Sequence, residues 1–297
     1  MTDKEKTAVA LGFFDGMHIG HQAVISAARA AAEKNGYVPS AFMIREKPRL
    51  PKFGGRIDVF ITPYDTKVSV FKNDFGIREI YAPFFEAIKD LSPEEFFSRD
   101  LVGVLNAAYV VCGEDFRFGK DRAGDVSTLD TLCKRAGIGF EAVPPVCVNG
   151  EEVSSTMLRE LIRSGDVKTA NELMLRPLTY TLPVVHGREI GRSIGFPTIN
   201  QEIRPFMVRP KRGVYASEVN IEGIRYTAIT NIGTKPTVKS DDTENMETHI
   251  IGFEDDLYRQ EVSVTILSYI RGECKFSSLD ALKAQLEADR NSVLTQK

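Results

Sequence analysis

The sequence has no tryptophan and only four histidines and four cysteines among its 297 residues. The cysteines are scattered and none forms a C-x-x-C pair, so neither a zinc site nor a disulfide framework is indicated. No apolar run approaches the roughly 18 residues of a membrane span, and the polar first residues do not resemble a signal peptide. A net charge of −3 gives no basic excess for nucleic acid or a membrane surface. We expect a cytoplasmic protein without nucleic-acid or membrane contacts, and no obligate protein partner is evident.

The length favours two domains, and apolar and charged contents of 42% and 27% are typical of globular chains. The first half alternates strand and helix patterns. Strands are expected near residues 8–11, 38–43, 77–82, 109–112 and 139–143, and helix signals lie between them. This alternation predicts an α/β domain with a Rossmann-like parallel sheet over residues 1–177.

The second half changes character after an Arg-Pro break at residues 176–177. Short runs rich in β-branched and aromatic residues fall near 180–185, 214–219, 225–232, 248–253 and 262–269. Such closely spaced strands predict an antiparallel β-barrel over residues 178–297. An amphipathic pattern near 278–293 predicts a terminal helix.

Two histidines, His18 and His21, lie in a glycine-containing turn between the first strand and an alanine-rich helix. Such a turn directs backbone N–H groups and the positive end of a helix at one point, which suits a phosphate. The imidazoles could donate to oxygens that gain charge at an attacked α-phosphate. A lone histidine here would more often be a polar cap, but the pair favours a nucleotidyl-transfer site. The phosphate-binding residues predicted here are Gly12, Phe14, Gly16 and Gly20.

A second group of glycine, arginine, threonine and asparagine residues spans residues 187–200. Its spacing differs from a Walker A loop, and the glycines alone would indicate only a hairpin. Thr198 and Asn200 offer neutral oxygens for Mg²⁺ held with nucleotide phosphates. Glu247, expected at a strand start, is either a solvated strand carboxylate or a base for an attacking hydroxyl. The phosphate-binding residues predicted here are Gly191, Arg192, Gly195, Thr198 and Asn200.

Both groups together resemble the prokaryotic bifunctional riboflavin kinase/FAD synthetase family, over nearly the whole chain. The similarity includes residues 113–119, 154–159, 231–237, 247–249 and 271–276. It implies phosphorylation of riboflavin to FMN in the second domain and adenylylation of FMN to FAD in the first, with ATP and Mg²⁺. The resemblance implies phosphate contacts for Ser155, Thr156 and Arg159, the catalytic base for Glu247, and flavin contacts for Asp115 and Arg271.

Two departures from the family pattern lie in the first domain. Residues 43–48 replace an acidic residue followed by Pro-x-Pro, with Arg45 and Lys47 as nearby cations, and Met157 stands where arginine is usual. The alternative is therefore a riboflavin kinase whose adenylyltransferase domain is weak or inactive. A non-catalytic flavin-binding protein is a further alternative. An aminoacyl-tRNA synthetase, which shares the His-Ile-Gly-His signature, is disfavoured by the absence of a lysine-rich second loop.

Overall fold

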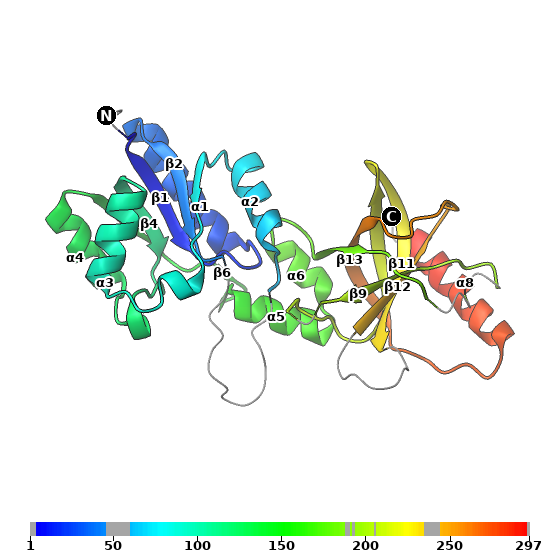
Figure 1. Ribbon diagram of the computed structural model, residues 1–297. Helices are drawn as coiled ribbons and strands as arrows, with labels where there is room; N and C mark the ends of the chain where they lie inside the picture. Colours follow the sequence, from blue (N-terminus) through cyan, green and yellow to red (C-terminus); the bar gives the residue numbers. More distant parts are fainter. Residues whose placement is uncertain are drawn as a thin grey trace. The chain divides into compact units, whose positions relative to one another are not determined.

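The computed structural model describes residues 4–45, 60–187, 191, 194–204, 206–234 and 244–295. The chain forms two compact units, Met1–Ser155 and Thr156–Lys297. Figure 1 labels many of their helices and strands. Within the described ranges, no helix is both long and apolar enough to cross a membrane.

The first unit contains a five-stranded parallel sheet in the order β3-β2-β1-β4-β5, which confirms the predicted α/β fold. Its elements are β1 (Thr7–Gly12), α1 (Ile19–Asn35), β2 (Val38–Met43), α2 (Tyr64–Asn73), β3 (Glu79–Tyr81), η1 (Phe85–Ala87), α3 (Pro93–Phe96), η2 (Phe97–Val104), β4 (Ala107–Gly113), η3 (Lys120–Arg122), α4 (Val126–Ala136), β5 (Gly139–Val143), β6 (Cys147–Val148) and β7 (Glu151–Glu152).

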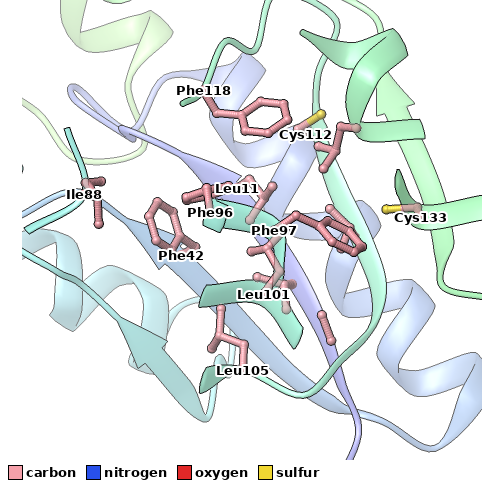
Figure 2. Close-up of a cluster of buried hydrophobic side chains, with 14 residues drawn as sticks. Leu11, Phe42, Ile88, Phe96, Phe97, Leu101, Leu105, Cys112, Phe118 and Cys133 are labelled. Atoms are coloured by element: carbon pink, nitrogen blue, oxygen red, sulfur yellow. The ribbon is translucent and has the colours of Figure 1, made fainter. Parts of the chain in front are cut away.

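Successive side chains of β1 point to opposite faces of the sheet, as in any β-strand. Ala8 packs against Ala31 and Ala32 of α1, where small side chains let the helix approach closely. The opposite face carries Val9 and Leu11 within a larger cluster that α3, η2 and α4 supply. Figure 2 shows this cluster, in which Phe96, Phe97 and Leu101 gather beside the strands.

The strand order makes β1 and β4 the point where the chain changes direction across the sheet. Ligands of open parallel sheets bind outside the carboxyl ends of the strands at such a point. The loop after β1 holds residues 13–18, and the loop after β4 holds residues 114–119. The sheet therefore brings the predicted histidine turn and Asp115 to one edge.

The second unit contains a six-stranded antiparallel sheet in the order β8-β13-β10-β11-β12-β9. Its elements are α6 (Val167–Leu173), β8 (Thr179–Pro183), β9 (Ile199–Ile203), β10 (Gly213–Ile221), β11 (Ile224–Thr234), β12 (Glu244–Ile250), β13 (Glu261–Arg271) and α8 (Leu279–Thr295), and α5 (Ser155–Ser164) enters it from the first unit.

The two edge strands of this sheet approach each other, so the sheet is a near-barrel with a terminal helix, as expected. Buried Gln201 on β9 donates from Nε2 to the Leu182 carbonyl oxygen at 2.7 Å and to the Val262 carbonyl oxygen at 2.8 Å. The Val185 N–H also donates to the Asn200 carbonyl oxygen at 2.8 Å. These bonds satisfy backbone groups that an open edge would leave unpaired.

Some local expectations were wrong. Glu247 lies inside β12, which begins at Glu244, because this strand pairs with β11 over its whole length. Of the four cysteines, Cys112 and Cys133 are buried, where burial raises the pKa of each thiol to about 12. Scattered cysteines without a pairing motif are expected to have structural roles. Cys147 and Cys274 are instead exposed, so this expectation fits only the first two.

Candidate active sites

The first candidate site is the turn between β1 and α1, residues 12–21. His18 directly precedes α1 and His21 lies in its first turn. The two imidazole rings stack, with centroids 3.6 Å apart and an angle of 29° between their planes. The two histidines predicted from the sequence are therefore in direct contact with each other.

His21 has an environment that disfavours its charged form. Burial lowers its pKa well below 6.5, and the nearby His18 and Lys67 lower it further. Its Nδ1 atom is buried and has no hydrogen-bond partner among the described residues. A buried polar atom without a partner is unfavourable unless a ligand or water supplies one. His21 is thus a neutral imidazole with unused hydrogen-bonding capacity.

Lys67, on α2, is a charged residue of this site that the sequence analysis missed. It is only 2% exposed, and its Nζ donates to the Phe13 carbonyl oxygen at 3.2 Å. Burial lowers its pKa, and the neighbouring Asp15 opposes that shift. The sequence spacing could have indicated that Lys67 is buried, because Lys67, Val70 and Phe71 are three and four residues apart and share one face of the helix.

Asp15 and Ser155 fix the backbone of the turn. The buried Asp15 carboxylate accepts from the backbone N–H groups of Ile61 and Thr62, at 3.0 and 3.1 Å. The Ser155 hydroxyl donates to the Asp15 carbonyl oxygen at 2.8 Å. The predicted phosphate-binding Ser155 thereby lies next to the turn. Thr156 is exposed and Arg159 is buried, both on α5 in the second compact unit.

The glycines and Phe14 determine how closely the rings pack. Phe14 is fully buried, and its ring lies 5.3 Å from His21 and 5.0 Å from Phe71 between centroids. The Phe14 side chain therefore packs against the His21 ring. Only the backbone of Phe14 is left for a contact with a ligand. A Cβ at Gly20 would lie 3.1 Å from Nδ1 of His18, so a larger residue there would press on that ring. Gly12 ends β1, and Gly16 lies in the turn.

Two other predicted features of the first unit lie apart from the histidines in sequence. Asp115 is exposed in the loop after β4. Arg45 follows β2, and its guanidinium lies 4.9 Å from the Tyr64 ring centre and 4.8 Å from that of Phe84. Lys47 lies outside the described residues. The arginine that replaces the usual acidic segment is therefore held between two aromatic rings.

The second candidate site is formed by Asn200 on β9 and Glu247 on β12, which are directly opposite each other in the antiparallel pair. Glu247 is exposed, whereas Asn200 is 6% exposed. The sequence analysis missed Asn245, which donates from Nδ2 to Oδ1 of Asn200 at 3.1 Å and to Oε1 of Glu247 at 3.3 Å. The strand register thus brings two predicted residues together and adds a third.

The loop before β9 carries the other predicted residues of this site. The Phe196 N–H donates to the Gly191 carbonyl oxygen at 2.8 Å, which closes the turn that contains Gly195. His249 carries its proton on Nδ1, because that atom lies 2.9 Å from the Pro197 carbonyl oxygen, which can only accept. Thr198 follows and is half-buried. Arg192 lies outside the described residues.

Arg271, predicted to contact flavin, forms an ion pair with Asp289 of α8. Its Nη2 lies 2.7 Å from Oδ2 of Asp289, its Nε donates to both carboxylate oxygens, and its Nη1 donates to the Gly272 carbonyl oxygen. Asp289 is 2% exposed. All three guanidinium nitrogens therefore have partners within the protein, and the bonds of Nε and Nη2 to Asp289 hold α8 against β13.

The described residues contain no group of three or more His, Cys, Asp or Glu side chains that could hold a metal ion by themselves. A divalent cation in either site would therefore need oxygens from a bound nucleotide. That arrangement is typical of Mg²⁺, which usually keeps few protein ligands and shares substrate phosphates.

Comparison with known proteins agrees with both units. The FAD synthetase family matches residues 1–157, and the riboflavin kinase family matches residues 174–296. The bifunctional riboflavin kinase/FMN adenylyltransferase of Bacillus subtilis is 32% identical, covering 98% of this chain and 93% of that protein. The enzyme of the same name from Pseudomonas fluorescens is 34% identical, covering 94% of this chain and 89% of that protein.

One solved structure shares the fold over nearly the whole chain. It is named as a macrolide-efflux protein from Streptococcus pneumoniae, with a TM-score of 0.87, 31% identity, and coverage of 98% of this chain and 94% of that one. The family matches in both halves and the curated relatives agree. The chain belongs to the bifunctional riboflavin kinase/FAD synthetase family.

Proposed function

We propose that the second unit phosphorylates riboflavin through Glu247, Asn200 and Thr198. The 5′-hydroxyl oxygen of the ribityl chain attacks the γ-phosphorus of ATP, ADP leaves, and the hydroxyl proton passes to the Glu247 carboxylate. The observation that carries this assignment is the direct pairing of Glu247 with Asn200 across β12 and β9. It puts a proton acceptor beside an amide oxygen suited to a nucleotide-bound cation. Phosphoryl transfer needs mainly such positioning and electrostatic stabilisation.

The donor set at this site fits Mg²⁺. Asn200 and Thr198 present neutral oxygens, and Glu247 adds a carboxylate nearby, all of which are hard oxygen donors. Bound with ATP, Mg²⁺ would neutralise charge that develops on the transferred phosphate. Asn200 and Thr198 would hold the ion, which leaves Glu247 available for the proton.

The first unit would adenylylate FMN. An FMN phosphate oxygen attacks the α-phosphorus of a second ATP, and pyrophosphate leaves. His18 and His21 would donate hydrogen bonds to the α-phosphate oxygens as charge grows there. Neutral His21 has one N–H to donate, and its partnerless Nδ1 is consistent with a ligand that completes the site.

Other residues of the first site have supporting roles in this proposal. The backbone of Gly12, Gly16 and Gly20 would approach the triphosphate, while Ser155, Thr156 and Arg159 would hold the leaving phosphates. Asp115 would contact the flavin, because its loop leaves the same sheet edge as the histidine turn. We keep the domain boundary near residue 177, close to residue 174, where the riboflavin kinase match begins. We also keep a cytoplasmic location, because both reactions consume ATP.

The alternative of a kinase alone rests on Met157 and on the replaced segment at residues 43–48. An assay with FMN and Mg-ATP but without riboflavin distinguishes the bifunctional enzyme from the kinase alone. Pyrophosphate and FAD formed in equal amounts are expected for a bifunctional enzyme. Riboflavin turnover with no pyrophosphate from FMN would leave only the kinase.

A further inference from the structure

Asn245 has an unusual position for an asparagine in a strand. It is 4% exposed, and it lies two residues before Glu247 on the same face of β12. Its Nδ2 group has two protons, one for Oδ1 of Asn200 at 3.1 Å and one for Oε1 of Glu247 at 3.3 Å. One side chain therefore joins the proposed base to the proposed metal ligand.

The chemistry of these groups fixes their orientation. An ionised carboxylate can only accept, so the part of Asn245 that faces Glu247 must be its NH₂ group. The same NH₂ group requires an acceptor from Asn200, so Oδ1 of Asn200 must face it. The whole Asn200 amide lies against Gly187, where an added Cβ would be 2.2 Å from Nδ2 and 2.8 Å from Oδ1. That contact admits either orientation of the amide, so the Nδ2 group of Asn245 decides which end of the Asn200 amide faces it.

A role in packing alone does not account for Asn245. Its Oδ1 is buried and has no hydrogen-bond partner among the described residues. Burying an amide oxygen in that way is unfavourable, and a leucine of similar volume would avoid it. The unfavourable burial of this oxygen is explained if the site requires the NH₂ group of the same side chain, which donates to Asn200 and Glu247.

We propose that Asn245 is a positioning residue for riboflavin phosphorylation. It turns the Asn200 amide so that its oxygen lies on the side of Glu247, and it holds the Glu247 carboxylate beside that oxygen. The inference rests on the proposed function of this site. Without Asn245, the Asn200 amide could rotate and present its NH₂ group, which repels a cation.

The test is Asn245→Leu, which keeps the volume and removes both donated hydrogen bonds. The Mg²⁺ concentration that gives half-maximal FMN formation is expected to rise about 10- to 100-fold, as for other residues that orient a metal ligand. The KM for riboflavin should change much less. Asn245→Thr, which suits a strand and retains one donor, should show a smaller rise.

Binding provides a readout without turnover. Calorimetric titration of Mg²⁺ and β,γ-imido-ATP is done in a His18→Ala, His21→Ala background, which weakens the first site. Asn245→Leu should weaken the Mg²⁺-dependent part of binding by the same factor as in the kinetic experiment. Unchanged Mg²⁺ dependence in both experiments would overturn the proposal.

A double-mutant cycle separates positioning from a general loss of stability. In an Asn200→Ala background, Asn245→Leu should add little to the Mg²⁺ requirement, because its target is already gone. The matched control is Ser217→Ala, which removes a buried hydroxyl that lies 2.7 Å from Thr230 in the same barrel. That variant should melt at a lower temperature with unchanged Mg²⁺ dependence. Equal effects of Asn245→Leu in both backgrounds would contradict the proposal.

Two results distinguish a wrong proposed function from a wrong role for Asn245. If the unaltered protein does not convert riboflavin to FMN, the proposed function is wrong. If it does, and Asn245→Leu matches it at every Mg²⁺ concentration, only the role of Asn245 is wrong. FMN adenylylation, assigned to the first unit, should be the same in both proteins.

Discussion

Replacing Glu247 with glutamine should abolish riboflavin phosphorylation and leave FMN adenylylation intact. Glutamine has the size of glutamate, and its amide oxygen can still accept from Nδ2 of Asn245, which lies 3.3 Å from Oε1 of Glu247. The substitution therefore removes the proton acceptor and preserves the local hydrogen bond. Because glutamine keeps that bond, buried Asn245 does not lose its partner.

The expected magnitude follows from this geometry. Loss of a positioned general base typically reduces the rate about 10²- to 10⁴-fold. This corresponds to roughly 2.7–5.4 kcal/mol of lost transition-state stabilisation. An exposed, isosteric substitution should change the free energy of unfolding by less than about 0.5 kcal/mol. Glu247→Gln should therefore lose riboflavin phosphorylation while its free energy of unfolding stays nearly unchanged.

The assay measures FMN formed from riboflavin and FAD formed from supplied FMN, each with Mg-ATP. Glu261→Gln, at an exposed carboxylate where β13 begins, is the matched control and should form FMN at the unaltered rate. A Glu247→Gln protein that phosphorylates riboflavin as fast as the unaltered protein would refute the assignment of the base.

Three further outcomes follow. His18→Ala with His21→Ala should lower FAD formation from FMN by at least about 100-fold and spare riboflavin phosphorylation; unchanged FAD output would exclude the imidazoles. Folding lowers the pKa of His21, so below pH ~6.5 the unfolded chain binds a proton that the folded chain does not. The stability contributed by neutral His21 is therefore complete above pH ~6.5 and falls below it by at most about 1.4 kcal/mol per pH unit. Urea unfolding at several pH values should show a shallower loss for His21→Phe, and identical slopes would contradict this. Arg271→Met should cost about 3 kcal/mol by leaving buried Asp289 without its cation, while the additional change Asp289→Leu should restore most of the stability; a double variant no more stable than the single one would contradict the buried-pair argument.

The strands and helices of the first unit could be predicted well because their signals are local. The expected strands at residues 38–43 and 139–143 coincide with β2 and β5, and the capping box at Ser92 is present. Proline after threonine at residues 62–63 is typical of a helix whose first residue is the proline, but α2 begins at Tyr64, with Pro63 as its N-cap and no side-chain cap hydrogen bond. Local signals thus locate an element more reliably than its first residue.

Strand β9 was not among the strands predicted from the sequence. Its buried positions include Asn200 and Gln201, so it lacks the apolar alternation of an ordinary strand. Gln201 is buried because its amide satisfies backbone carbonyls of β8 and β13. Only the folded barrel brings those carbonyls to it.

Some site residues could be predicted from a local motif, whereas others could not. His18 and His21 are close in sequence, and their pairing could be predicted from the motif. Lys67 reaches the first site from α2, and Asn245 joins two residues of different strands. Both depend on contacts between distant segments, which no local pattern specifies.

The central claim is that one chain uses ATP at two separate sites, one of which transfers the γ-phosphate and the other the adenylyl group. The most direct test supplies riboflavin with Mg-ATP labelled at either the γ- or the α-phosphorus and separates FMN from FAD. Label from the γ-position should enter FMN and then FAD, whereas label from the α-position should enter FAD alone. Flavin products that never carry α-label, or FMN that forms without γ-label, would contradict the account.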